Sequence, residues 1–155
     1  MGLEGHIKHT SKNGGIEGLK KRTQPAVVKV GVLSGAGEHN KGEAGQTVAE
    51  IGWWNEFGTV NIPARPVLGP TIRKNGKDYR RLMRRLMKDM LLGKVTNKVA
   101  QGKLGLLVQR DIQAAIVALR SPPNAPSTIK MKGSANPLID TGQFRQSISW
   151  SPWDL

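Results

Sequence analysis

One stretch of the chain carries its strongest periodic signal: YRRLMRRLMKDML, residues 79–91. Its large apolar residues recur at intervals of three and four, which is the spacing of one face of an α-helix. They are Tyr79, Leu82, Met83, Leu86, Met87, Met90 and Leu91. The sequence therefore predicts a helix over 77–92, and Gly93 stands where a helix commonly stops.

The opposite face of this helix is strongly basic. It carries Arg80, Arg81, Arg84, Arg85 and Lys88. Between residues 73 and 94, nine Lys or Arg stand against two Asp, a surplus of seven positive charges. Most charge runs are solvated faces, but so large a surplus is costly without counterions or an anionic partner. Because no aromatic residues are interleaved with the cations, we expect any contact with nucleic acid at its phosphate backbone.

A second helix and two strands complete the main pattern. Apolar residues repeat the helical spacing over 104–120. Residues 25–33 (PAVVKVGVL) place three valines on one face of a strand, and residues 147–153 (SISWSPW) alternate polar and apolar side chains. We expect the second strand to pair with the first or with a partner chain. Two amphipathic helices joined by a short linker suit an antiparallel pair laid on a sheet.

Shorter elements connect these four. Thr47 and Glu50 have the spacing of a capping box, which predicts a helix over 47–57 that stops at Gly58. A strand is the competing interpretation, because Ile, Trp and Phe favour pleated sheets, but the capping box favours the helix. The other predictions are an extended elbow over 62–66, loops over 122–126 and 130–137, and a short helix starting near Thr141 with Asp140 or Thr141 as its cap.

The predicted fold class is α+β: a small antiparallel or mixed β-sheet with two amphipathic helices packed on one face, and extended polar arms. A length of 155 residues fits one domain. We expect residues 1–24, which are rich in glycine and charge, to form a polar N-terminal arm. Residues 25–155 then form a single α+β domain with a C-terminal strand and tail.

Composition excludes several classes of function. The chain has no Cys, so thiolate metal sites and cysteine nucleophiles are ruled out, and its formal net charge is +13. The glycine-rich stretch 31–37 matches no nucleotide-binding motif, and the carboxylates are scattered singly. We therefore expect no enzyme activity, no catalytic, metal-binding or cofactor-binding residues, and no cofactor. No apolar run approaches the roughly 18 residues of a membrane span, so no membrane partner is expected.

Several short motifs follow one another in a fixed order. They are WNEFGT (54–59), IPARP (62–66), the basic helix pair, PPNAPST (122–128) and PLIDTGQFR (137–145). Each motif alone is weak, but the ordered set is specific. Over about residues 25–150 it resembles the tail-completion or neck proteins of long-tailed bacteriophages. The chain departs from that pattern at Val67-Leu68, where such proteins have a bulkier aromatic residue.

The resemblance implies a structural virion protein that forms a ring, commonly a hexamer, at the junction of head and tail. It would lie in the virion neck or tail, and in the host cytoplasm during assembly. Its partners would be further copies of itself, neighbouring neck, head-closure and tail-tube proteins, and genome DNA in the lumen. The basic face would line that lumen or meet an acidic neighbouring ring. Strands at a sheet edge could also extend a neighbour's sheet.

The motif residues are expected to be structural. They are Asn55, Glu56, Phe57, Gly58, Thr59, Pro63, Arg65, Pro66, Leu138, Asp140, Thr141 and Gly142. Because Arg65 is a lone cation between two prolines, we also expect it to form a buried ion pair with Glu56 or Asp140. Trp150 and Trp153 are candidates for core anchors or for interface anchors.

Two other functions remain open at this point. A tail terminator, which caps the tail tube, would use a similar small fold. A free protein that binds DNA without sequence preference would instead use the basic helix face.

Overall fold

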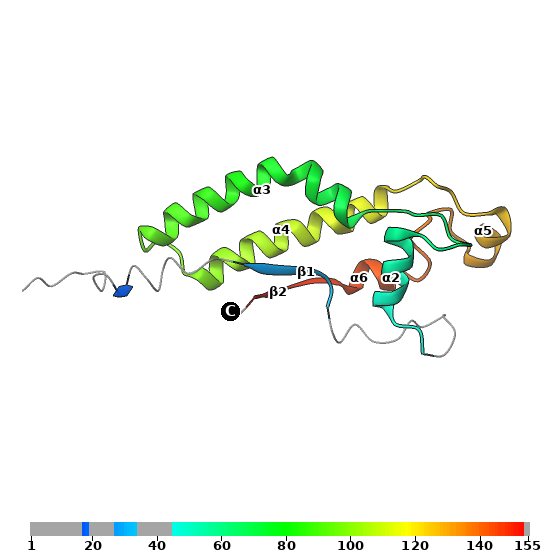
Figure 1. The fold of residues 1–155 in the computed structure, drawn as a ribbon, viewed down its shortest axis with the longest axis horizontal. Coiled ribbons are helices and arrows are strands. Elements are labelled where there is room, and N and C mark those ends of the chain that lie inside the picture. The colour runs from blue at the N-terminus through cyan, green and yellow to red at the C-terminus, as the bar shows by residue number, and fades with distance from the viewer. Residues whose placement is uncertain (1–16, 19–26, 34–44, 154–155) are drawn as a thin grey trace, which may run out of the picture.

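A computed structural model describes residues 17–18, 27–33 and 45–153 of the chain. Two long antiparallel helices set its length (Figure 1). They are α3 (Leu68–Leu91) and α4 (Asn97–Ala118). Three shorter helices gather at the end of the molecule away from the turn that joins α3 to α4. They are α2 (Val48–Phe57), α5 (Pro126–Lys132) and α6 (Gln143–Ser147).

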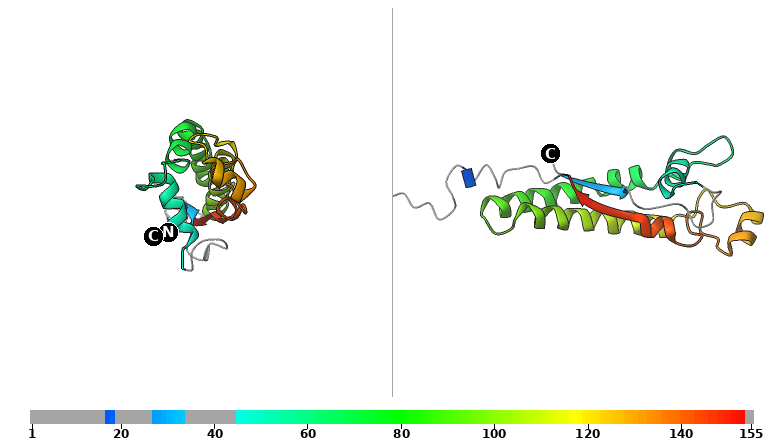
Figure 2. Two further views of the ribbon diagram at one scale, coloured as in Figure 1. Left: turned by 90° about the vertical axis from the view of Figure 1, so that its right-hand side faces the viewer. Right: turned by 90° about the horizontal axis from the view of Figure 1, so that it is seen from below.

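A two-stranded antiparallel ribbon lies along α4. Strand β1 (Val28–Val32) pairs with β2 (Ile148–Pro152), with Val30 opposite Trp150. Helix α4 covers one face of the ribbon, and α3 packs on α4 (Figure 2). The predicted α+β class is confirmed, and so is the pairing of the two predicted strands. Within that class, α4 makes most of the helix contact with the strands, and α3 rests chiefly on α4.

Both long helices begin earlier than their apolar periodicity predicted. Helix α3 starts at Leu68, nine residues before the predicted start, with Pro70 in its first turn. A proline there is tolerated because its missing N–H would have no partner within the helix. Helix α4 starts at Asn97, because the Thr96 side chain caps it by accepting a hydrogen bond from the Val99 N–H at 3.3 Å.

The short helices bear out the predictions only in part. Helix α2 has the predicted capping box between Thr47 and Glu50. At the start of α6 the predicted cap is wrong, because Gly142 holds the N-cap position with a left-handed φ of 81°. Part of the predicted 130–137 loop is helical in α5, which opens on Pro126 and closes on Gly133 at φ 68°. Both ends of α5 have the expected proline and glycine signals.

The core lies between α4 and the ribbon and is completed by α2 and α6. Four of its side chains are almost completely buried: Val48, Ile112, Ile116 and Ile148. A second small cluster at the α3–α4 turn consists of Leu86, Met90 and Ala100. The apolar stripe of α3 is buried only along the side that faces α4. Its other side, which includes Met83, Met87 and Leu91, stays 38–46% exposed.

Trp150 fixes the ribbon to α4. Its ring lies over Gly102 and Gly105, and a Cβ placed on Gly105 would stand only 2.5 Å from the ring. Glycine at position 105 therefore permits a close approach that any larger residue would block, whereas a Cβ on Gly102 would make an ordinary contact at 3.5 Å. The predicted N-terminal arm over 1–24 lies outside the described residues, except for Glu17 and Gly18.

Candidate functional site

Glu56 of α2 caps the next helix in the chain. Its carboxylate oxygens accept hydrogen bonds from the backbone N–H groups of Val67, Leu68 and Gly69 at 2.7, 3.0 and 2.9 Å. Val67, the N-cap residue of α3, supplies no side-chain cap of its own. A negative charge at this place satisfies orphan donors and interacts favourably with the helix dipole. Glu56 therefore determines where α3 begins.

The residues after Glu56 form a tight turn. The Thr59 hydroxyl accepts hydrogen bonds from the N–H groups of Asn61 and Ile62 at 3.3 and 3.1 Å. Gly58 has a positive φ of 77°, and a Cβ there would lie 3.0 Å from the backbone of Ile62 and Ala64. The turn brings the chain back, so that the Arg65 N–H donates to the Asn55 carbonyl at 2.6 Å. The WNEFGT and IPARP motifs are thus one folded unit.

Arg65 ties that unit to a distant loop. Its Nε donates to the Pro122 carbonyl at 3.0 Å and its Nη2 to the Pro123 carbonyl at 3.1 Å. The side chain is buried, and burial lowers the pKa of Arg65 from its usual value. The structure does not show the expected pair of Arg65 with Glu56, because Glu56 binds the start of α3 and the Arg65 guanidinium donates to backbone carbonyls. The alternative pair of Arg65 with Asp140 stays a prediction.

A third segment, missed by sequence reasoning, joins the same end of the molecule through Asn136. Its Nδ2 donates to the carbonyls of Ile116 and Val117 at 3.3 and 2.9 Å, which are orphan acceptors at the end of α4. Its Oδ1 accepts from the Leu138 N–H at 2.9 Å. The available sequence signal was an Asn-Pro pair, which favours turns but does not name a distant partner.

These segments surround an open depression of about 710 Å³. Seven of the predicted motif residues line it: Asn55, Pro63, Arg65, Leu138, Asp140, Thr141 and Gly142. Lys132 also lines it and donates to the Pro137 carbonyl at 3.2 Å. Burial lowers the pKa of Lys132, the Asp140 carboxylate raises it, and the charge of Arg65 lowers it. The depression thus combines two cations, a carboxylate and several amides, which suits binding of polar surface.

Three of the five remaining motif residues line a second, more apolar hollow of about 580 Å³ between α2 and the start of α3. Glu56, Phe57 and Pro66 line it together with Trp53. The rings of Trp53 and Phe57 lie 4.2 Å apart and are 64% and 61% exposed. An exposed aromatic pair beside an apolar hollow is typical of a contact surface for another protein.

The basic face of α3 is exposed along its whole length. Arg80, Arg81, Arg84, Arg85 and Lys88 are all exposed. Within α3, the ion pair between Arg81 and Asp78 joins two solvent-exposed side chains at 3.0 Å. Exposed pairs of this kind contribute little, so most of the positive charge remains available to a partner.

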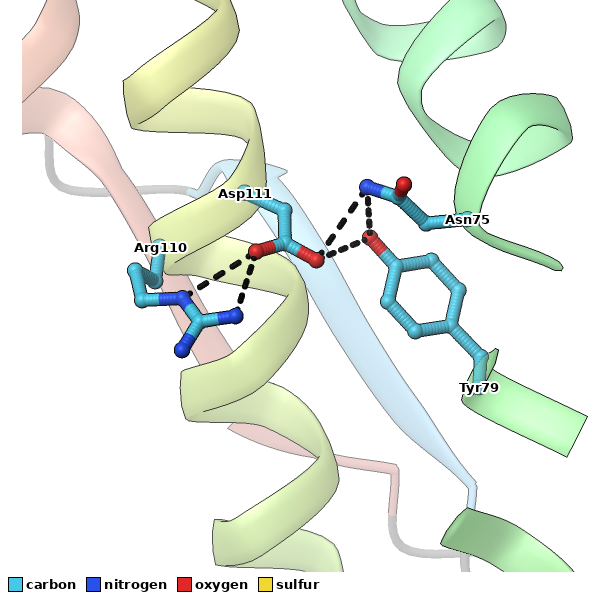
Figure 3. Close-up of polar contacts among 4 residues, drawn as sticks. All are labelled: Asn75, Tyr79, Arg110 and Asp111. Carbon is cyan, nitrogen blue, oxygen red and sulfur yellow. Dashed lines mark hydrogen bonds and ion pairs between the residues drawn. The ribbon is translucent and has the colours of Figure 1, made fainter. Parts of the chain in front are cut away.

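A polar cluster fastens α3 to α4 (Figure 3). The Tyr79 hydroxyl donates to Asp111 Oδ2 at 3.0 Å, and the Asn75 amide donates to the same oxygen at 3.2 Å. On the other side, Arg110 donates to Asp111 Oδ1 through Nε and Nη2 at 3.1 and 2.8 Å. Burial is the main reason that the pKa of Tyr79 is raised. This arrangement satisfies its members and holds two helices together.

The two tryptophans proposed as anchors lie in different environments. Trp150 packs on α4 as a core anchor, whereas Trp153 is 44% exposed with the Lys29 ammonium 4.3 Å from its ring centre. Trp153 therefore remains the candidate for an interface.

Neither a metal centre nor a membrane span is present in the part of the chain that the structure describes. Its residues contain no group of three or more His, Asp or Glu side chains that could hold a metal ion. Among the described helices, none combines the length and apolar character needed to cross a bilayer. No protein-family model, no curated protein and no solved structure matches this sequence.

Proposed function

We propose that this chain is a structural, non-catalytic virion protein: a ring-forming tail-completion or neck component that joins tail to head in a long-tailed bacteriophage. One observation supports this most directly. The motif residues that carry the resemblance come from three separate segments, yet they lie together at one end of the molecule. Arg65 joins the first segment to the second through backbone carbonyls, and Asn136, next to the third segment, binds the end of α4. A motif set that builds one shared unit is stronger support than the same motifs scattered.

The surfaces of the molecule suit assembly. An exposed aromatic pair, a polar depression and a long basic helix face are all available to neighbours. In a closed ring each copy uses two different patches of its surface, one for the copy on each side. The basic face then lines the lumen, where genome DNA passes, or meets an acidic neighbouring ring. The ring of about six copies follows from the family resemblance and not from these contacts.

Removing the gene from its phage tests this role. A joining protein is needed after heads and tails are complete, so we expect DNA-filled heads and separate tails of normal length. Adding the purified chain should restore joined, infectious particles. Tails of uncontrolled length would instead identify the chain as a tail terminator. Normal joined particles would overturn both versions of the proposal.

The alternative of a free DNA-binding protein rests on one observation, the exposure of the cations on α3. It predicts duplex binding that weakens steeply between low and moderate salt, because each neutralised phosphate releases counterions. Tight binding of that kind, together with normal particles after gene removal, would favour this alternative.

A further inference from the structure

A groove runs between β1 and α3, with α4 as its floor. Its walls are apolar: Val28 and Val30 come from β1, and Ile72 and Met83 come from α3. Leu104 and Val108 of α4 form the floor with Tyr79, and the groove has a volume of about 270 Å³. The exposed side chain of Met87 continues the α3 wall by one helical turn. This is where the unburied half of the apolar stripe of α3 lies.

The edge of β1 that faces away from β2 is unpaired among the described residues. The ribbon has two strands, and the Trp153 N–H donates to the Val27 carbonyl at 3.0 Å. In an antiparallel pair, hydrogen-bonded and non-hydrogen-bonded positions alternate. The backbone groups of Val28, Val30 and Val32 therefore point away from β2. Such an edge, about 17 Å long, is a ready template for another strand.

The charges that α3 places beside the groove have one sign, although Glu56 of α2 lies near Arg73 at one end. At about 100° of rotation per residue, Arg73, Arg80 and Arg84 follow Met83 and Met87 around α3 on the groove side. The guanidinium groups of Arg73 and Arg80 lie 3.2 and 3.4 Å from positions that a Cβ would take on Gly69 and Gly76, on that same flank. Both acidic residues of α3, Asp78 and Asp89, fall on the opposite flank. An occupant of the groove therefore meets cations without a compensating carboxylate of α3.

We propose that this groove binds an extended, acidic segment of a partner protein, which joins β1 as a third strand. Backbone groups of Val28, Val30 and Val32 hold the segment, and alternate apolar side chains face the valines and the floor. Its acidic side chains pair with Arg73, Arg80 and Arg84. Nucleic acid fits this groove poorly, because phosphates gain nothing from an apolar floor or from a strand edge. The inference rests on the proposed function, since it names the chemistry by which a neighbouring virion protein would attach.

Methionine methyl resonances provide a site-resolved test in the full chain. The probe is a blocked nine-residue peptide that alternates valine with glutamate, and its control replaces each glutamate with lysine. We expect the acidic peptide to shift the methyl signals of Met83 and Met87 and to leave Met131 unchanged. Met131 is 80% exposed on α5 and reports non-specific contact. The lysine peptide should shift none of them.

Matched charge reversals separate the groove from net charge alone. R80E/R84E changes the groove flank, whereas K74E/R85E makes the same change of net charge on the other flank. We expect the first to weaken peptide binding by about tenfold or more and the second by less than about threefold. Val30→Pro removes an N–H on the free edge but none that β2 uses, so it should abolish binding while Met90, in the second cluster, keeps its resonance.

Three results would overturn the inference: no shift of Met83 and Met87 with the acidic peptide, equal losses in the two charge-reversal variants, or full binding by Val30→Pro. Shifts of Met83 and Met87 by duplex DNA alone would assign the face to nucleic acid. These outcomes are independent of the gene-removal test, because a protein that joins heads to tails could do so without using this groove.

Discussion

Gly105 allows a close packing contact with Trp150, although glycine lowers the stability of a helix. Glycine weakens a helix, so Gly102 and Gly105 argue against a helix start before about residue 104. The structure shows that the Trp150 ring packs against both glycines and so fixes β2 to α4. The sequence contains both partners, but nothing in their spacing pairs a glycine on a helix with a tryptophan about 45 residues later.

Replacing Gly105 with Ala tests this packing contact. Because the new Cβ would lie 2.5 Å from the Trp150 ring, we expect a loss of about 1–3 kcal/mol in the free energy of unfolding. Gly102→Ala is the matched control, since its Cβ would meet the same ring at an ordinary 3.5 Å. There the helix preference for Ala should give a neutral or stabilising change. Urea unfolding of both variants measures the difference. Equal free energies of unfolding would refute the close packing of Trp150 on Gly105.

We expect the stability of the folded unit formed by residues 54–66 to depend most strongly on Glu56. Glu56→Ala leaves three N–H groups of α3 without their acceptor, so the free energy of unfolding should fall by about 2–3 kcal/mol. Glu56→Gln keeps one acceptor oxygen and should lose less. Asp78→Asn, which removes an exposed pair, should change stability by under about 0.5 kcal/mol. If the Asp78 variant lost as much as Glu56→Ala, the capping role would be wrong.

At the scale of elements, the junction of α3 and α4 depends on the Asp111 cluster as well as on packing. Tyr79 is buried, and its hydroxyl reaches Asp111 across the helix pair. Tyr79→Phe should cost about 1–2 kcal/mol, because it leaves Oδ2 of Asp111 with fewer donors. A double-mutant cycle with Asp111→Asn should show a coupling above about 0.5 kcal/mol. Purely additive losses would mean that the two side chains act independently.

The elements also show where sequence reasoning succeeds. The C-terminal half of α3 follows from its own apolar period, and the ribbon follows from alternation in two short stretches. The first nine residues of α3 do not, because their N-terminal cap is Glu56, which is remote in sequence. The partners of Arg65 were missed for a related reason. Backbone carbonyls exist at every residue, so no pattern singles out those of Pro122 and Pro123.

The candidate contact surfaces lie in different parts of the elongated molecule. The motif residues lie at one end, and the long α3–α4 pair extends away from it (Figure 1). Helix α3 carries the basic face, and both helices line the groove. The sequence predicted the class of fold, and seven of its motif residues line the depression of about 710 Å³. It did not predict the groove, because a helical stripe does not tell which of its sides will be covered.

Closure into a ring is the property on which the proposed function depends. The direct measurement is the mass of the full chain by light scattering across concentration and salt, alone and bound to tails purified after gene removal. The proposal predicts a discrete assembly of about six copies of the 16.9 kDa chain, free or on each tail end. A monomer in solution that also binds tails as single copies, or that does not bind them, would contradict it.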